Sequence, residues 1–378
     1  MKYCKKCLQP DTRPNIYFNK FGVCPACIYY YSTRGINYAI RFKKLENILK
    51  EAKKKKKNNF YDCIIGVSGG KDSTRQALWV REKLKLKPLL VCLSYPPEQV
   101  TRIGTKNISN LINLGFDVEI ISLGPKTWKK LLLNSFLENC NWAKPSEQAL
   151  FSSLPLAAKR HDIELIFLGE NPGYQLGDMK TLGKNGYDGN NIFKMNTLNG
   201  NSIKWMEKIG IDKNKLYHYS HISKIKNTKF NIIYLGYFWK NWSIKKNGIV
   251  SSLYGLNLRK DKFYNTQDIR GVFSLDEDWV IINQMIKYYK YGFGRISDYI
   301  NEDIRNGIIK RNEAISILEK YDGNCNEVYI SSFCKYLGIK PKFFWKTVKK
   351  FTNKKLFKIN TKGRPSPKFK VGIGINET

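Results

Sequence analysis

The chain has 378 residues, of which 42% are hydrophobic and 13% aromatic, and nine are cysteines. That length predicts two or three domains, and the apolar content excludes both a disordered chain and a small scaffold that depends on disulfides. The 66 lysines and arginines exceed the 31 aspartates and glutamates by 35 charges, and their spread along the chain favours a generally basic surface, with an anionic substrate or weak nucleic-acid binding as alternatives.

The first predicted unit, residues 1–45, carries two Cys-x-x-Cys pairs, Cys4 with Cys7 and Cys24 with Cys27. This spacing is typical of a zinc ribbon, in which each pair supplies two thiolates to one tetrahedral ion. Four sulfur ligands leave no position for water, so the sequence predicts a structural Zn²⁺. The sequence shows neither the apolar core of a signal peptide nor a run of the ~20 apolar residues that span a membrane. We therefore expect a cytoplasmic protein with no membrane partner.

Residues 58–245 alternate between predicted strands and helices. The strands are predicted from short apolar runs at 61–67, 88–93, 117–123, 164–168 and 232–235. Helix-compatible segments between these runs predict parallel βαβ units, so the fold class is α/β with a parallel sheet. Residues 172–230, rich in glycine, asparagine and lysine, are interpreted as an insertion over the carboxyl edge of the sheet.

Residues 270–352 are predicted to form a helical carboxyl-terminal region. Apolar residues recur at helical spacing after Asp276, which can cap the first helix. Further helices are predicted over 296–305, 311–320 and 342–351. Residues 353–378 contain glycine, proline and lysine without periodicity and are expected to form a flexible tail.

The most informative motif is Gly66–Thr74, which reads Gly-Val-Ser-Gly-Gly-Lys-Asp-Ser-Thr between a predicted strand and a predicted helix. It is not a Walker A loop, because Ile65 stands where that motif requires glycine and Asp72 follows the lysine. It has the PP-loop pattern, in which glycines let backbone N–H groups converge on phosphate oxygens at a helix amino terminus. A loop that holds the β- and γ-phosphates of ATP predicts transfer of AMP and release of pyrophosphate.

Two charged residues of this loop have predicted roles in binding ATP. Lys71 is predicted to neutralise phosphate charge, and Asp72 is predicted to hold Mg²⁺. The predicted ATP-binding residues are Ser68, Gly69, Gly70, Lys71, Asp72, Ser73 and Thr74.

Several motifs together resemble the N-acetyl sugar amidotransferase family over roughly residues 1–350. They are the cysteine pairs, the PP-loop, Gly169–Pro172 with Leu176–Asp178, Tyr234–Tyr237, and Ser274–Asp278 with Tyr288–Arg295. This family includes the pseudaminic acid amidating enzyme of flagellin glycosylation and its lipopolysaccharide O-antigen counterparts. The resemblance implies a PP-loop ATP pyrophosphatase fold. It also implies that ATP and ammonia from glutamine convert an N-acetyl group of an acidic bacterial sugar to an acetamidino group.

On this resemblance, Glu170 joins Lys71 and Asp72 as a candidate catalytic residue. It would orient the acetamido group or accept a proton from ammonia, and a capping carboxylate is the alternative. Asn171 and Asp178 are candidates for binding substrate or metal. Arg295 is the candidate for the sugar carboxylate, because a planar guanidinium suits that group; a surface salt bridge is the alternative.

The resemblance also implies partners. No glutaminase nucleophile with a supporting histidine is evident, so we expect a separate glutaminase subunit, with a channel subunit, to supply ammonia. We expect no specific nucleic-acid partner.

The main alternative is a tRNA-thiolating ATP pyrophosphatase, which also joins zinc sites to a PP-loop. Such enzymes carry a central cysteine pair or cluster site, whereas Cys140 stands alone here and eight residues separate Cys325 from Cys334. A zinc-ribbon adaptor that retains only nucleotide binding is a third interpretation.

Overall fold

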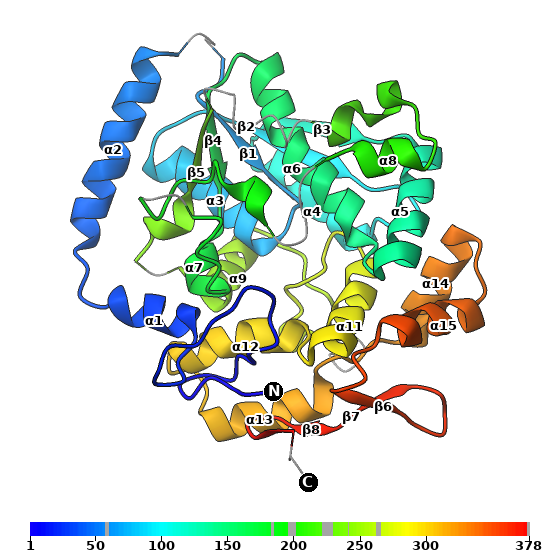
Figure 1. Cartoon of the computed structure of the whole chain (residues 1–378). Coiled ribbons are helices and arrows are strands. Elements are labelled where there is room, and N and C mark those ends of the chain that lie inside the picture. The colour runs from blue at the N-terminus through cyan, green and yellow to red at the C-terminus, as the bar shows by residue number, and fades with distance from the viewer. Residues whose placement is uncertain are drawn as a thin grey trace.

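A five-stranded parallel sheet lies at the centre of the computed structural model, which describes residues 1–56, 60–182, 185–195, 202–220, 230–240, 242–261 and 266–375. The strand order is β3-β2-β1-β4-β5 (Figure 1). The strands are β1 (Cys63–Gly66), β2 (Pro88–Ser94), β3 (Val118–Ser122), β4 (Leu165–Leu168) and β5 (Asn231–Tyr234). The sheet confirms the predicted α/β class, and every predicted strand is present.

Helices cover both faces of the sheet. Successive side chains of a strand point to opposite faces, so neighbouring residues of one strand join different cores. Ile64 joins a core with α5 and α6, whereas Cys63 and Ile65 join a second core with α2, α3 and α4. These helices are α2 (Tyr38–Lys54), α3 (Lys71–Lys83), α4 (Arg102–Asn113), α5 (Pro125–Asn139) and α6 (Ala143–Arg160). Burial on both faces explains why the strands read as continuous apolar runs.

The carboxyl-terminal region is helical, as predicted. Its helices are α11 (Trp279–Tyr291), α12 (Arg295–Arg305), α13 (Arg311–Tyr321), α14 (Glu327–Leu337) and α15 (Pro341–Phe351). Neither α14 nor α5 was predicted from the sequence. These two helices meet in the core, where Phe136 of α5 stacks on Phe344 of α15 at 5.2 Å and lies edge-on to Phe333 of α14 at 5.6 Å. The helical region therefore shares a core with the sheet.

Residues 353–375 differ from the flexible tail that the sequence predicted. They form two hairpins, β6 (Phe357–Ile359) with β7 (Pro365–Pro367) and β8 (Phe369–Lys370) with β9 (Gly374–Ile375). Phe357 and Phe369 are buried, with ring centroids 5.6 Å apart, and Phe357 also packs edge-on against Tyr288. Burial of these aromatic rings holds a segment whose own sequence has no periodicity.

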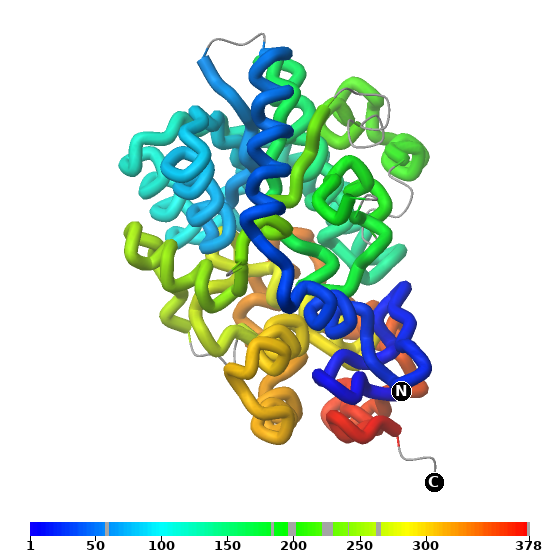
Figure 2. The backbone as a smooth tube through the Cα atoms, turned by 90° about the vertical axis from the view of Figure 1, so that its left-hand side faces the viewer, coloured from blue at the N-terminus to red at the C-terminus, as the bar shows by residue number. Residues whose placement is uncertain are grey.

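The amino-terminal segment docks on the carboxyl-terminal helices rather than on the sheet. Its backbone pairs Tyr3 with Pro10 and then forms α1 (Pro25–Ser32). The backbone N–H of Leu8 donates to Asn301 Oδ1 of α12 at 2.7 Å. In Figures 1 and 2 this segment lies beside the carboxyl-terminal end of the chain. The helix α2, which follows, runs up the outside of the sheet and buries Leu45 against it.

The predicted insertion lies between β4 and β5. Its described parts are α7 (Pro172–Gln175), η1 (Ile192–Lys194), α8 (Lys204–Lys208) and η2 (Lys213–Tyr219). Met206 and Leu216 are fully buried in the core that contains α6. These described parts of the insertion, α8 and η2, are therefore packed against the sheet domain. After β5 the chain forms η4 (Leu235–Tyr237) and α9 (Ile244–Leu253). In the part of the chain that the structure describes, no helix is both long and apolar enough to cross a membrane.

Candidate functional site

The sheet has a topological switch point between β1 and β4. The chain runs from β1 through β2 to β3 on one side, and then returns to place β4 and β5 on the other side. In open parallel sheets, ligands bind outside the carboxyl ends of the strands at such a point. A recess lies there, which we call the switch-point recess. Its polar lining is made by Ser68, Gly70, Lys71, Asp72, Ser73, Gln76, Glu170, Ser274, Asp276 and Arg295.

The loop after β1 has the geometry of an anion-binding turn. Gly69 has a φ of +72°, and a Cβ there would lie 2.9 Å from the Cβ of Asn107, so both the backbone conformation and the space require glycine. Gly70 is the residue before the first turn of α3, and its carbonyl accepts a bond from Ser73 Oγ at 3.1 Å. Backbone N–H groups at the start of α3 therefore line a recess, an arrangement that binds phosphate.

Lys71 and Asp72 form a fixed pair at the base of this loop. Lys71 Nζ lies 2.9 Å from Asp72 Oδ2 and 4.1 Å from the centroid of the Phe273 ring. Asn247 of α9 donates from Nδ2 to Asp72 Oδ1 at 2.6 Å, and Ser251, one turn later, donates to the Lys71 carbonyl at 2.6 Å. Asn247 was not predicted from the sequence, because no local pattern marks it.

Glu170 follows β4 and lines the same recess as the PP-loop. Trp242 Nε1 donates to the carbonyl of Gly169 at 2.8 Å and fixes the backbone beside it. The residue is exposed towards this recess, which partly shields it from bulk water. This partial removal from water is the main cause that raises the pKa of the Glu170 carboxyl; the charge of Asp72 adds to it, whereas Lys71 opposes it.

The carboxyl-terminal region closes the recess with Asp276 and Arg295. Arg295 begins α12, and its guanidinium carbon lies 5.4 Å from the centroid of the Phe273 ring. Asp276 is not the helix cap that the sequence predicted, because α11 begins only at Trp279. Burial raises the pKa of the Asp276 carboxyl to about 6, although Arg295 and Arg259 oppose this shift. Asp276 is thus a site residue that the sequence analysis did not identify as one.

Some predicted site residues lie elsewhere. Thr74 is 1% exposed within α3, and neither it nor Gly69 lines the recess. Asn171 is buried and caps α7, since its Oδ1 accepts from the Tyr174 N–H at 3.2 Å and its Nδ2 donates to the Gly236 carbonyl at 3.3 Å. The side-chain amide of Asn171 is therefore occupied by hydrogen bonds within the protein. Asn171 lines an open groove between α1, α2 and α9 and not the switch-point recess.

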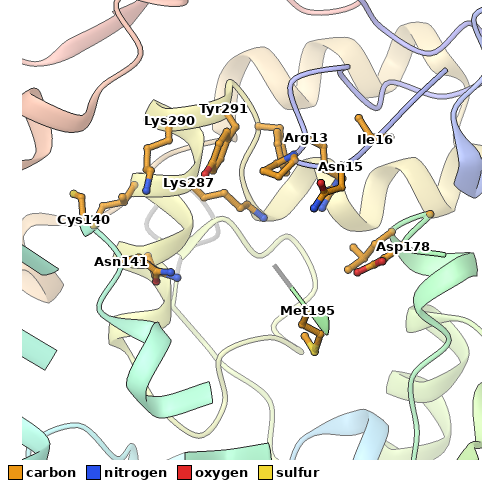
Figure 3. A pocket seen from close by; sticks show the side chains of 16 residues that line it. Arg13, Asn15, Ile16, Cys140, Asn141, Asp178, Met195, Lys287, Lys290 and Tyr291 are labelled. Carbon is orange, nitrogen blue, oxygen red and sulfur yellow. The ribbon is translucent and has the colours of Figure 1, made fainter. Parts of the chain in front are cut away.

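Asp178 lines a different cavity, which we call the ribbon recess, of about 240 Å³ (Figure 3). Four parts of the chain meet around it: the segment after the first cysteine pair, the link between α5 and α6, the insertion, and α11. Its lining includes Arg13, Asn15, Ile16, Cys140, Asn141, Asp178, Met195, Asn283, Ile286, Lys287, Lys290, Tyr291 and Phe293.

The four amino-terminal cysteines converge, as predicted. Their sulfur atoms all lie within 4.8 Å of one another, with 3.9 Å between Cys4 and Cys27 and 3.7 Å between Cys7 and Cys24. Metal–sulfur bonds of about 2.3 Å at tetrahedral angles separate the sulfurs by about 3.8 Å. The Cys24 N–H also donates to Cys4 Sγ at 3.2 Å, which orients that ligand. The four residues therefore fit one tetrahedral metal ion.

Comparison with known proteins gives both partial structural likenesses and a family match. NMN synthetase from Francisella tularensis is 18% identical, with a TM-score of 0.29 over 48% of this chain and 74% of that chain. NH3-dependent NAD synthetase from Campylobacter jejuni is 14% identical, with a TM-score of 0.30 over 51% of this chain and 93% of that chain.

The third structure is the U34-tRNA thiolase NcsA from Methanococcus maripaludis with its 4Fe-4S cluster. It is 14% identical, with a TM-score of 0.30 over 81% of this chain and 86% of that chain. No curated protein sequence matches the chain. Residues 259–370 match the family described as LPS biosynthesis protein WbpG-like, C-terminal domain, and this segment supplies Asp276 and Arg295 to the switch-point recess. The same matched segment also supplies α11 to the ribbon recess.

Proposed function

We propose that the protein is an ATP-dependent amidotransferase that converts an N-acetyl group of an acidic bacterial surface sugar to an acetamidino group. One observation carries this proposal: the PP-loop, Glu170 and six residues of the WbpG-like segment, Asp276 and Arg295 among them, line the same recess at the switch point. A nucleotide-binding loop thus faces residues of a domain associated with lipopolysaccharide synthesis. The predicted resemblance to N-acetyl sugar amidotransferases supplies the reaction.

The reaction requires activation of a poor electrophile. The amide oxygen of the acetamido group attacks the α-phosphorus of ATP, the bond from that phosphorus to the β-phosphate bridge breaks, and pyrophosphate leaves. The amide nitrogen passes its proton to water, which gives an O-adenylated imidate. Ammonia then adds to the imidate carbon, the carbon–oxygen bond breaks, and AMP leaves the amidine. The protein contributes chiefly position and charge stabilisation.

The residues of the recess have matching roles in this proposal. Backbone N–H groups before α3, with Ser68 and Ser73, hold the departing pyrophosphate, and Lys71 neutralises its charge. Asp72 holds Mg²⁺, which supplies Lewis-acid stabilisation of phosphate charge when bound. Glu170, whose pKa is raised, hydrogen-bonds the acetamido nitrogen and accepts the proton that ammonia loses.

The metal of the four-cysteine site is proposed to be a structural Zn²⁺. Sulfur separations of 3.7 and 3.9 Å suit a single ion, because each cysteine of a four-iron cluster binds a different iron atom. The cluster joins the ribbon into one unit, and this unit contacts α12 through Leu8 and Asn301. We further propose that a separate glutaminase subunit, with a channel subunit, delivers the ammonia.

A tRNA-thiolation reaction is less well supported by the remaining cysteines. A persulfide carrier needs an accessible thiolate. Burial raises the pKa of Cys92 and Cys140 to about 12 and that of Cys334 to about 11. Cys63 is fully buried, and burial also raises the pKa of Cys325. These five side chains are therefore protonated thiols at neutral pH.

Product analysis tests the proposal directly. Purified protein with MgATP, ammonium and candidate acidic N-acetyl sugars is expected to form AMP and pyrophosphate, and the sugar should lose about one mass unit as O is replaced by NH. Glu170→Gln should lose sugar turnover while ATP binding is kept, because its carboxylate is not part of the phosphate-binding loop. Release of ADP and phosphate, or transfer of sulfur to tRNA with no change in any sugar, would refute the proposal.

A further inference from the structure

The ribbon recess holds three basic side chains that the reaction steps above do not use. Figure 3 shows the amino group of Lys287 pointing into the cavity, with Arg13 nearby and Asp178 and Met195 around the opposite wall. Lys290 lies at one end, where its Nζ donates to the carbonyl of Asn139 at 2.9 Å. The cavity is too small for a polymer strand and has room for one small ligand.

Arg13 and Lys287 are held in place before any ligand arrives. Arg13 Nε donates to Gln9 Oε1 at 2.9 Å, and the guanidinium lies 4.3 Å from the centroid of the Phe293 ring. Both cations pair with Asp298, Lys287 through a 2.6 Å contact to Oδ2. Their side chains are only 14% and 21% exposed. Each retains further N–H donors, since a guanidinium has five and an ammonium three.

These three cations outnumber the two carboxylates around the recess, Asp298 and Asp178. Burial opposes ionisation of Asp298, but Lys287 and Arg13 together hold its pKa well below the usual range. Burial, with a smaller contribution from the positive charges of Arg13 and Arg295, lowers the pKa of Lys287 to about 8, although Asp298 opposes this shift. Asp298 and, on the opposite wall, Asp178 therefore face three cations in a region shielded from water, and this excess of one positive charge attracts an anion.

We propose that Arg13 and Lys287 bind the carboxylate of the acidic sugar in the ribbon recess. This inference rests on the proposed function and assigns the carboxylate to this pair instead of Arg295, which faces the phosphate-binding loop. Asp178 accepts hydrogen bonds from sugar hydroxyls, and Met195 contacts the apolar face of the ring. A charge-assisted fork and a second cation suit a planar carboxylate.

The ribbon recess adjoins the switch-point recess along the chain, and the proposal requires one sugar to extend from one to the other. Phe293 lines the ribbon recess and Arg295, two residues later, lines the switch-point recess. Burial raises the pKa of Tyr234, and the charges of both Glu170 and Asp178 raise it further. Glu170 of the switch-point recess and Asp178 of the ribbon recess thus both lie within electrostatic range of Tyr234 in β5.

The open groove between α1, α2 and α9 provides a contrast. Its lysines, Lys240, Lys245 and Lys246, are exposed, so water already solvates them and they need no bound anion. A lysine of this groove is therefore a matched control for Lys287, with the same charge and a different degree of burial.

The test measures binding of N-acetylneuraminic acid and of neutral N-acetylmannosamine to the full chain by ligand-observed NMR. We expect the wild type to prefer the acid, and Lys287→Met and Arg13→Gln each to weaken acid binding about tenfold or more. Lys287→Arg should restore most of the affinity, because it keeps a cation at the position. Lys245→Met should bind as the wild type does.

Folding of each variant is checked by thermal melting. Lys287→Met should melt near the wild type, since Arg13 still pairs with Asp298. Equal binding of acid and neutral sugar by the wild type, or unchanged acid binding by folded Lys287→Met and Arg13→Gln, would overturn the proposal.

The same preparations separate this inference from the proposed function. If an acidic sugar is amidinated and Lys287→Met leaves its KM unchanged, the carboxylate site is wrong and the function stands. If acid binding depends on Lys287 but no acetamidino product forms, the site stands and the function fails.

Discussion

The two recesses are assembled from the chain in different ways. The switch-point recess takes its phosphate-binding groups from one short stretch, residues 66–74, at the end of β1. The ribbon recess takes its polar groups from the ribbon, the α5–α6 link, the insertion and α11. The first therefore depends on the local conformation of a loop, whereas the second exists only when the ribbon is docked on α11 and α12.

The largest expected effect is loss of AMP formation when Asp72 of the phosphate-binding loop is replaced, because that loop belongs to the switch-point recess alone. Asp72→Asn should lower AMP formation about 100- to 1000-fold, because it removes the charge that holds Mg²⁺ but keeps the size of the side chain. Affinity for the acidic sugar should change little. Chromatography of AMP and pyrophosphate measures the loss, with exposed Asp117→Asn as control. AMP formation within threefold of the wild type would show that Asp72 is not part of the site.

The second prediction breaks the ribbon recess instead. Cys24→Ser should remove the metal and lower the free energy of unfolding by several kcal/mol (~3 or more), with a drop in Tm of roughly 5–10 °C. Sugar affinity should fall more than ATP affinity, since Arg13 belongs to the ribbon. Elemental analysis should find one zinc per wild-type chain. Cys325→Ser, outside the cluster, is the control; equal losses of sugar and ATP affinity in Cys24→Ser would contradict the separation of the two recesses.

The third prediction concerns the support of Asp72 by α9. Asn247→Ala should reduce AMP formation about 10- to 100-fold, because a carboxylate that holds a metal depends on its own hydrogen-bond partners for orientation. Steady-state kinetics at varied Mg²⁺ concentrations should show the main loss as a lower apparent affinity for Mg²⁺. Exposed Ser252→Ala on the same helix should leave the kinetics unchanged. A loss in both variants would indicate general disturbance of α9.

The smallest effect is the pH dependence of stability at Asp276. Burial raises the pKa of this carboxyl to about 6, so the folded chain binds the proton more tightly than the unfolded chain does. The ionised side chain therefore costs stability increasingly as the pH rises through 6.

Asp276→Asn removes this cost. Its stability advantage over the wild type should be larger at pH 8 than at pH 5 by about 1 kcal/mol, a value reduced by the partial exposure of the side chain. Denaturant unfolding at the two pH values measures it. A stability advantage of Asp276→Asn that is equal at the two pH values, or larger at pH 5, would show that Asp276 is not desolvated.

Local patterns in the sequence determined the strands, the four-cysteine cluster and the PP-loop. Buried strands need continuous apolar runs, and tetrahedral thiolates and a phosphate loop each need fixed residue types at short spacing. Such features form from neighbours along the chain, so Cys4 with Cys7 and Ser68 with Asp72 were recognisable by spacing alone. Glu170 was also found, because it follows a predicted strand at the edge where ligands bind.

Tertiary packing decided the rest. The hairpins of residues 353–375 exist because Phe357 and Phe369 bury their rings against Tyr288. Asn247 reaches Asp72 across 175 residues of sequence, and Arg13 meets Asp298 across 285. No periodicity or motif encodes a contact at such separation. Such contacts depend on which apolar faces of the helices and strands pack together. Burial of those faces fixes where the polar side chains at their edges meet.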